Sequence, residues 1–268
     1  MADKKEPVPI KPASTILLLR DGADDMEVLM VERHHQIDFA SGALVFPGGK
    51  VDPADGIDNP ADIRPLCDCA DDFDDLELAF RVAAIRESFE ESGMLLARKD
   101  GALAGPDHVA ALSDARDALN ARETTMGEIA ATHSLTLALD LLQPFARWVT
   151  PAFMHKRFDT MFYLARVPEG QIEAHDGSEA VDTVWISPQA ALTAAEAGER
   201  TIIFPTRKNV EKLGRTSNVE EAFAAAVADD IVTVEPWMEK NGDKHLLKLP
   251  PEAGYGDGDE PLDAIMGG

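Results

Sequence analysis

The sequence predicts an α/β fold, and three features of its 268 residues lead to that prediction. Two apolar runs, residues 14–20 and 26–33, flank an Asp- and Gly-rich turn and predict a β-hairpin. Residues 81–96 instead carry apolar side chains at helical spacing. With 45% hydrophobic residues, the chain is long enough to bury a sizeable core between such strands and helices.

The hairpin is expected between a short lead-in and a long polar segment. Residues 1–12 predict a flexible lead-in, and residues 21–25 (DGADD) are expected to form the hairpin turn. His34 and His35 follow the second strand, where such a pair more often caps a strand in solvent than it binds a metal or a phosphate. Residues 56–75 are rich in Asp and Pro, so we expect them to loop away from the core.

We expect one long helix to organise the rest of the chain. Its apolar stripe follows steps of four, three, four and seven residues through Leu78, Val82, Ile85, Phe89 and Leu96. Asp74 or Asp75 is the predicted N-cap, where an acidic side chain suits the helix dipole. The helix is expected to end near Arg98, ahead of an Asp-Gly pair.

Three carboxylates, Glu87, Glu90 and Glu91, are predicted to lie opposite this stripe. Their spacing makes them neighbours on the helix, and like charges this close repel one another. Water accommodates such a face on many amphipathic helices, whereas a hard divalent cation such as Mg²⁺ would neutralise it. The helix alone leaves both alternatives open.

The remaining chain is predicted to contain further helices and strands. Residues 106–122 and 126–143 are rich in Ala and Leu and predict a helical insertion or lid, which Pro144 ends. After it we expect strands at 145–150, 157–166 and 181–186, a short helix at 188–199, helices at 205–213 and 219–227, a β-like segment at 231–234, and a tail from residue 254.

Charge and composition argue against several classes of partner. A net charge of −24 opposes non-specific binding to nucleic acid or an anionic membrane, because the long-range field repels phosphates. Metal ions could still bridge such an acidic enzyme to a phosphate substrate. Cys67 and Cys69 are the two cysteines, and a lone C-x-C pair favours neither a zinc site nor a disulfide. Since the N-terminal residues lack an apolar leader and no segment reaches membrane length, we expect a soluble, cytoplasmic protein.

Two further stretches combine into an ordered pattern. Residues 46–55 (FPGGKVDPAD) lie upstream, and residues 86–94 (RESFEESGM) lie within the long helix. Together they resemble the Nudix box, G-x5-E-x7-R-E-U-x-E-E-x-G-U, where U is an apolar residue. Gly49 matches the first glycine, and the later positions are matched by Arg86, Glu87, Glu90, Glu91, Gly93 and Met94.

The sequence departs from the box at three places. Asp55 replaces the first Glu, Ser88 replaces an apolar residue, and the spacer is lengthened to residues 56–85. Upstream residues resemble a signature of Nudix enzymes that cleave coenzyme A and its thioesters. This sequence departs from that signature at Asp38 and Val31. The long spacer resembles the long-insert branch of that coenzyme A diphosphatase group. The matching upstream residues are Leu29, Met30, Arg33, Gly42 and the segment 46–49.

This resemblance implies the Nudix α/β/α sandwich, with a mixed sheet between helical layers. It places a Nudix hydrolase domain at residues 12–203, with one insertion inside the box at 56–75 and a helical insertion at 104–143. Residues 204–268 would then form a C-terminal helical extension and tail.

The chemistry that the resemblance implies is hydrolysis of a diphosphate bond in a nucleoside diphosphate linked to another moiety. Glu87 and Glu91, one turn apart, are the expected ligands of Mg²⁺ or Mn²⁺, with Glu90 as the third. Arg86 is expected to hold a neighbouring carboxylate through a bidentate ion pair. Glu179 begins an E-x-x-D-x-x-W pattern similar to one found late in many Nudix domains. It is the expected general base, with a purely structural role as the alternative.

Substrate contacts are expected from Arg33, Lys50 and the Gly48–Gly49 backbone, whose glycines permit a tight turn and close approach to a ligand. Lys156 and Arg157 are further cations for a 3′-phosphate. The expected partner is a small-molecule nucleoside diphosphate derivative, and coenzyme A or acyl-coenzyme A is favoured over ADP-ribose or a nucleotide sugar. A non-catalytic nucleotide-sensing module is an alternative that the intact arginine and glutamates disfavour. The oligomeric state stays open, with a homodimer as one alternative.

Overall fold

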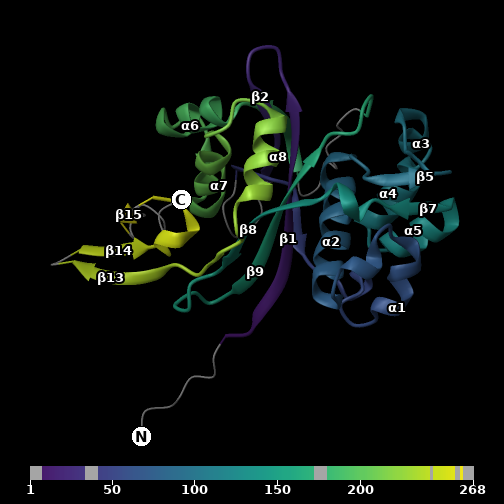
Figure 1. Ribbon diagram of the computed structural model, residues 1–268, viewed down its shortest axis with the longest axis horizontal. Coiled ribbons are helices and arrows are strands. Elements are labelled where there is room, and N and C mark those ends of the chain that lie inside the picture. The colour runs from purple at the N-terminus through teal and green to yellow at the C-terminus, as the bar shows by residue number, and fades with distance from the viewer. Residues whose placement is uncertain (1–7, 34–41, 172–179, 242–243, 257–259, 262–268) are drawn as a thin grey trace, which may run out of the picture.

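The computed structural model describes residues 8–33, 42–171, 180–241, 244–256 and 260–261, and one mixed sheet lies at its centre (Figure 1). Within that part of the chain the sheet runs β11-β3-β2-β1-β9-β8-β12, with β10 added to β2 and β4 added to β1. β1 pairs antiparallel with β2, which confirms the predicted hairpin, and parallel with β9. The strands are β1 (Ile10–Asp21), β2 (Met26–Arg33), β3 (Ala43–Val45), β4 (Gly48–Lys50), β8 (Gln143–Val149), β9 (Arg157–Arg166), β10 (Ala180–Ile186), β11 (Thr201–Ile202) and β12 (Thr233–Val234).

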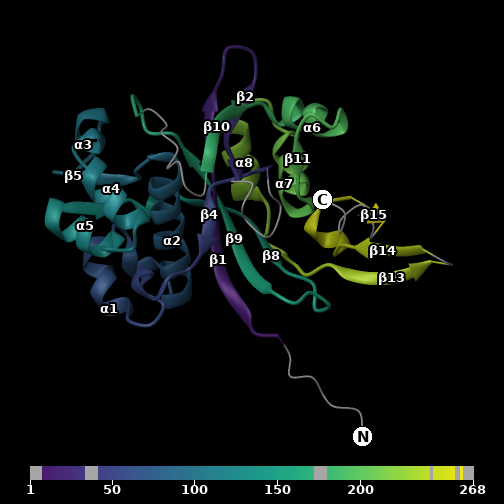
Figure 2. The same ribbon diagram turned by 180° about the vertical axis from the view of Figure 1, so that it is seen from behind.

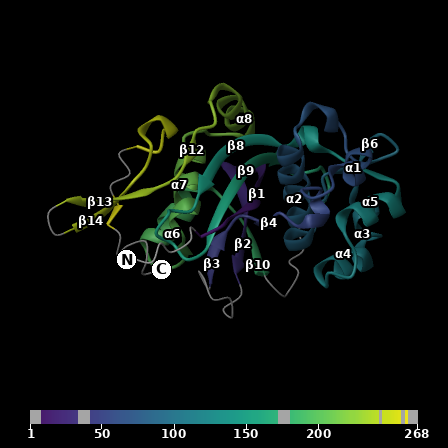
Figure 3. The ribbon, with the colours of Figure 1, turned by 90° about the horizontal axis from the view of Figure 1, so that it is seen from below.

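Helices cover both faces of this sheet, as the predicted sandwich requires (Figure 3). On one face α2 (Asp75–Ser92) packs against β1 and β4. The opposite face is covered by α6 (Pro188–Glu196), α7 (Phe204–Leu213) and α8 (Val219–Ala228). Smaller elements flank α2: α1 (Pro60–Ile63), α3 (Pro106–Ala110), α4 (Ser113–Asn120), α5 (Met126–His133), and a sheet of β5 (Ala97–Lys99), β6 (Ala102–Leu103) and β7 (Leu135–Leu137).

Strand β1 supplies both layers of the core. Successive side chains of a strand point to opposite faces, so Ile16 and Leu18 pack in the core with α2. Leu17 and Leu19 pack in the other core, with α7 and α8. A strand buried on both faces reads as an unbroken apolar run, which explains the STILLLR segment of the sequence.

Helix α2 begins where the sequence predicts and ends earlier. Asp74 is the N-cap, and its side chain accepts the backbone N–H of Glu77 at 2.8 Å. The expected end near Arg98 is wrong, because Gly93 adopts a left-handed φ of 74° and closes the helix after Ser92. The Asp-Gly pair beyond Arg98 instead joins two short strands, β5 and β6.

The spacer inside the box packs on the core, so the expectation that it loops away is wrong. Ile63 is only 3% exposed and lies in the same core as α2. Arg64 donates to the carbonyl of Ala70 and to the Asp75 carboxylate, and the backbone N–H of Asp68 donates to the Leu137 carbonyl at 2.9 Å. A few apolar residues among the Asp and Pro residues are sufficient to anchor the segment: Ile57, Ile63, Leu66 and Phe73.

The two spacer cysteines are free thiols, as predicted. Cys67 is half-buried, and its Sγ donates to the carbonyl of Ile63 at 3.3 Å. Burial, with a contribution from the charge of Asp68, raises the pKa of the Cys67 thiol to about 12. A raised pKa makes the thiol a poorer nucleophile, and Cys67 packs against the core that contains α2.

Later segments match the predicted elements more closely than the insertion does. The insertion is helical only as far as His133, after which β7 and a short 3-10 turn lead into β8. β9, α7 and α8 lie within one residue of their predicted bounds. The division at residue 203 stays a prediction, although α7 and α8 pack on the central sheet and β12 pairs with β8.

A second small sheet follows β12 and consists of β13 (Trp237–Asn241), β14 (Lys244–Lys248) and β15 (Glu260–Pro261). Leu247 and Leu249 of this region join the core under α7. None of the helices in the described residues combines the length and apolar character needed to cross a membrane.

Candidate active site

Strand β4 brings two glycines between β1 and helix α2 (Figure 2). Gly48 pairs with Thr15 and Gly49 with Ser14 in antiparallel register. A Cβ at Gly49 would lie 2.3 Å from Oε1 of Glu87, and a Cβ at Gly48 would lie 2.6 Å from Oγ1 of Thr15. The expectation of a tight turn at these glycines is therefore wrong. They are needed because only a residue without a side chain lets the strand approach the Glu87 carboxylate.

Arg86 is the centre of the hydrogen-bond network on this side of α2. Its Nε and Nη2 donate to the two carboxylate oxygens of Asp55, each at 2.9 Å, which is the bidentate ion pair expected from the sequence. Its Nη1 donates to Glu87 Oε1 at 2.8 Å and to Glu90 Oε2 at 2.6 Å. Nη2 also donates to the Lys50 carbonyl at 2.8 Å, so Arg86 ties β4 to α2.

Asp55 replaces the longer Glu of the motif and still reaches Arg86. It ends a 3-10 turn, Pro53–Asp55, whose N-cap is Asp52. The Asp55 carboxylate accepts the backbone N–H of Asp52 at 2.7 Å, and the Asp52 carboxylate accepts that of Ala54. This reciprocal capping box holds a carboxylate that is only 1% exposed in contact with the guanidinium.

The buried charges do not balance. Burial raises the pKa of Glu87 to about 7, although adjacent Arg86 lowers it and Glu90 raises it further. Burial likewise raises the pKa of Asp55 against the opposing effect of Arg86. Burial disfavours the charge of Arg86 itself, but its carboxylate partners outweigh that effect and raise the guanidinium pKa. One guanidinium thus compensates the carboxylates incompletely, and a second positive charge would be favourable here.

Glu91 faces the same strand as Glu87. Its Oε2 accepts the backbone N–H of Gly48 at 3.1 Å. Exposure of 7% for Glu87 and 8% for Glu91 rules out a solvated acidic face at these two positions.

The described residues contain no group of three or more His, Cys, Asp and Glu side chains already arranged to hold a metal ion. The donors nevertheless fit a hard divalent cation. The carboxylates of Glu87 and Glu91 are buried, and the one guanidinium nearby does not compensate all the carboxylates around it.

The structure describes only some of the predicted substrate contacts. Lys50 follows the two glycines in β4, its carbonyl accepts from Arg86, and its side chain is exposed. Arg33 ends β2, opposite Ala180 of β10, and its side chain lies outside the described residues, as do Glu179, His34, His35 and Asp38 in full. Arg157 donates to the Thr150 carbonyl at 2.9 Å and to Glu235 at 2.5 Å, so its guanidinium is held by the protein.

Two residues missed by the sequence interpretation hold the C-terminal end of α2 and the segment that follows it. Arg116 of α4 donates to the carbonyls of Phe89 and Glu90, at 2.7 and 2.8 Å, where the helix dipole is negative. Gln171 accepts the Leu95 N–H at 2.9 Å and donates to the Leu95 carbonyl at 3.0 Å. No local pattern marks either residue, because their partners are distant in sequence.

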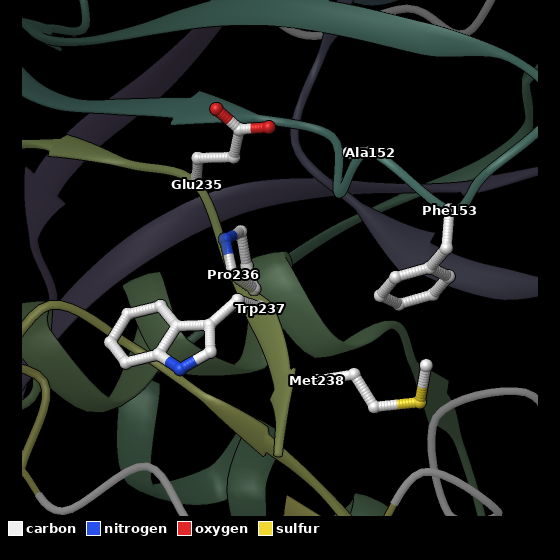
Figure 4. A pocket seen from close by; sticks show the side chains of 6 residues that line it. All are labelled: Ala152, Phe153, Glu235, Pro236, Trp237 and Met238. Atoms are coloured by element: carbon white, nitrogen blue, oxygen red, sulfur yellow. The ribbon is translucent and has the colours of Figure 1, made fainter.

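Two cavities lie apart from the carboxylates. One, of about 340 Å³, borders the end of α2 near Gly93, Arg116 and Gln171. The other, of about 320 Å³, lies between the β8–β9 connection and β13 (Figure 4). Figure 4 shows Phe153 and Met238 extending toward the same space. Its charged lining residue, Glu235, is paired with Arg157, so this second cavity offers no cation for a diphosphate.

Comparisons with known proteins agree with this geometry. The family model described as the NUDT19 Nudix domain matches residues 70–213, which is more than half of the chain. The crystal structure of a NUDIX hydrolase from Alicyclobacillus acidocaldarius superposes with a TM-score of 0.62 at 32% identity, covering 81% of this chain and 96% of that one.

Curated relatives point to the same family. The "Putative nudix hydrolase 7" of Caenorhabditis elegans is 31% identical over 197 residues, which cover 72% of this chain and 57% of that relative's length. The human "Acyl-coenzyme A diphosphatase NUDT19" is 25% identical, covering 84% of this chain and 72% of the human protein. The family model, the solved structure and the arginine-centred carboxylates agree, and this chain therefore belongs to the Nudix hydrolase family, in a group related to the coenzyme A diphosphatases.

Proposed function

We propose that this protein is a divalent-cation-dependent hydrolase that cleaves the diphosphate bond of coenzyme A or of an acyl-coenzyme A. The observation that carries the proposal is the buried cluster in which Arg86 binds Asp55, Glu87 and Glu90 beside the glycines of β4. The names of the human, Xenopus laevis and Gallus gallus relatives support the substrate class.

Glu87 and Glu91 are the side chains that would hold Mg²⁺ or Mn²⁺, with Glu90 as a third ligand. Bound there, the cation supplies a Lewis acid that lowers the pKa of a water molecule and stabilises charge on phosphate oxygens. Arg86 keeps two of the carboxylates in position through its hydrogen bonds, and the N–H of Gly48 orients the third. Because these contacts exist within the protein, little reorganisation is needed when substrate binds.

In the proposed reaction, water attacks one phosphorus of the diphosphate, and the bond between that phosphorus and the bridging oxygen breaks. Glu179 is the proposed acceptor of the proton that the water loses. Coenzyme A would yield 3′,5′-ADP and a phosphopantetheine product. Hydrolysis replaces the diphosphate with two new phosphate monoesters, so loss of the diphosphate signals in phosphorus NMR distinguishes the products from the substrate.

Recognition of the 3′-phosphate requires positive charge from this chain, because a net charge of −24 repels phosphates. Lys50, exposed next to Gly49, and Arg33, at the end of β2, are the proposed contacts. Arg157 is a weaker candidate than the sequence suggests, since Glu235 already pairs with it.

A substrate panel tests the proposal. Coenzyme A, an acyl-coenzyme A, dephospho-coenzyme A and ADP-ribose are incubated with the protein and Mg²⁺ or Mn²⁺, and mass spectrometry and phosphorus NMR identify both products. Cleavage of the coenzyme A compounds to 3′,5′-ADP supports the assignment. Cleavage of ADP-ribose alone would replace it with the nucleotide-sugar alternative, and cleavage of none would favour a nucleotide-sensing module.

The role of Glu91 is tested by Glu91→Gln, which keeps the shape of the side chain and removes its charge. Turnover should fall by on the order of 100-fold or more if the carboxylate binds the cation. Glu211→Gln, on α7 across the sheet, is the matched control and should retain turnover. Normal turnover of the Glu91 variant at saturating Mg²⁺ would exclude Glu91 from the site.

A further inference from the structure

Ser14 is a buried residue of β1 whose hydroxyl makes no hydrogen bond within the described part of the protein. The residue is 0% exposed, and its Oγ lacks a partner. Two other buried serines differ from it: Ser88 Oγ donates to the Met94 carbonyl at 2.8 Å, and Ser92 Oγ donates to the Ser88 carbonyl at 2.7 Å. Since buried hydroxyls in native proteins are almost always paired, the lone one at Ser14 requires an explanation.

The register of β1 directs this hydroxyl toward the carboxylates. Ser14 lies two residues before Ile16, whose side chain packs in the core with α2, so both point to the α2 face. Ser14 is also the direct antiparallel partner of Gly49. Partner residues in an antiparallel pair project side chains to the same face, with Cβ positions about 4.5–5.5 Å apart.

The Glu87 carboxylate occupies the space where a side chain of Gly49 would lie. A Cβ on Gly49 would lie 2.3 to 2.9 Å from the carboxylate atoms of Glu87. The Ser14 side chain therefore projects from the face on which the Glu87 carboxylate lies, and its hydroxyl makes no hydrogen bond to that carboxylate. A ligand that bonds both groups would pair this hydroxyl, and because Asp55, Glu87 and Glu90 share the one guanidinium of Arg86, a hydrated cation suits that place.

We infer that Ser14 is a positioning residue of the cation site, and that its hydroxyl would accept a hydrogen bond from a water molecule of the hydrated divalent cation that Glu87 and Glu91 would hold. This inference rests on the proposed function, which supplies the cation. The Ser14 hydroxyl satisfies no partner among the described residues, and Ile16 and Leu18, its neighbours on the same face of β1, belong to an apolar core. On this inference, the Ser14 hydroxyl serves the hydrated cation and not the packing of the core.

The test compares Ser14→Ala with Ser88→Ala, two deletions of the same atom from fully buried serines. Mn²⁺ affinity is measured by electron paramagnetic resonance of the free ion, and the melting temperature is measured in a chelator and in excess Mn²⁺. Ser14→Ala should bind Mn²⁺ about 10-fold more weakly, the lower end of the range for groups that orient a metal site. Its melting temperature in chelator should equal or exceed that of the wild type, because an unpaired buried hydroxyl is removed.

Ser88→Ala should show the opposite behaviour. Its melting temperature in chelator should fall, because the Met94 carbonyl loses its partner, and its Mn²⁺ affinity should be unchanged. If the wild type binds Mn²⁺ and Ser14→Ala binds it equally tightly, the role of Ser14 is overturned and the proposed function is not affected. Failure of the wild type to bind Mn²⁺ would overturn the proposed cation dependence, and the role of Ser14 with it.

Discussion

On the α2 face of the sheet a single arginine binds two buried carboxylates and one half-buried carboxylate, whereas on the opposite face Trp148, Asn209 and Tyr255 are joined by hydrogen bonds. The Trp148 Nε1–H donates to the Tyr255 hydroxyl at 3.2 Å, and that hydroxyl donates to Asn209 Oδ1 at 2.7 Å. Asn209 Nδ2 in turn donates to the Pro205 carbonyl at 3.0 Å. This neutral chain of bonds joins the C-terminal segment to α7 and β8 and leaves no excess charge.

The difference shows two uses of buried polar groups. In the Tyr255 network, donors and acceptors pair within the protein, so the network contributes to the fold. In the Arg86 network, burial raises the pKa of Glu87 and Asp55, and the nearby Ser14 hydroxyl has no described partner. Polar groups that the fold leaves undercompensated are those available to a ligand, and the expected experimental consequences differ for the two faces.

The largest effect is expected from Arg86→Ala. It leaves the buried Asp55 and Glu87 carboxylates and the half-buried Glu90 without their cation, and breaking buried ion pairs costs about 3–5 kcal/mol of unfolding free energy. Denaturant unfolding measures the loss, and turnover should vanish with it. Arg215→Ala is the control on the other face, where the exposed guanidinium donates to the Gly254 carbonyl, and it should cost about 0.5 kcal/mol. Equal losses in the two variants would remove the distinction between the faces.

A second, smaller effect is expected from Gly49→Ala. The new methyl group would displace the Glu87 carboxylate, and misplacement of a catalytic group by about 1 Å can cost on the order of 100-fold in rate. Gly214→Ala at the end of α7 is the matched control, since its Cβ would meet Pro188 at 3.2 Å and slight movement relieves that contact. Steady-state kinetics of both variants decide the point. Comparable turnover in both would show that the Gly49–Glu87 contact has no catalytic role.

The smallest effect is expected from Tyr255→Phe, and it should be confined to stability. Loss of the hydroxyl leaves Trp148 Nε1 and Asn209 Oδ1 without their partner, at a cost of about 1–3 kcal/mol. Turnover and Mn²⁺ affinity should remain those of the wild type. A change in either would mean that the network on this face also supports the site.

Local sequence patterns predicted many of the elements and several site residues. Strands β2 and β9, the N-cap Asp74 and the α7 and α8 helices follow from periodicity and capping, which depend on residues close in sequence. The spacer was mispredicted because its composition is polar, whereas four scattered apolar residues anchor it. The end of α2 was mispredicted because apolar residues continue past Gly93 into β5.

By itself the sequence determined the box: the glutamates, Arg86 and the paired glycines stand at fixed spacing, and one helical turn places Glu87 beside Glu91 whatever the rest of the chain does. Tertiary structure alone decided that Asp55 is the partner of Arg86, that the glycines form a strand against Glu87, and that Ser14 faces the carboxylates. Those relations depend on strand register and on contacts between residues more than 30 positions apart, such as the bond of Arg86 to Asp55. Spacing along the chain does not specify such distances in space; the packing of β1, β4 and α2 does.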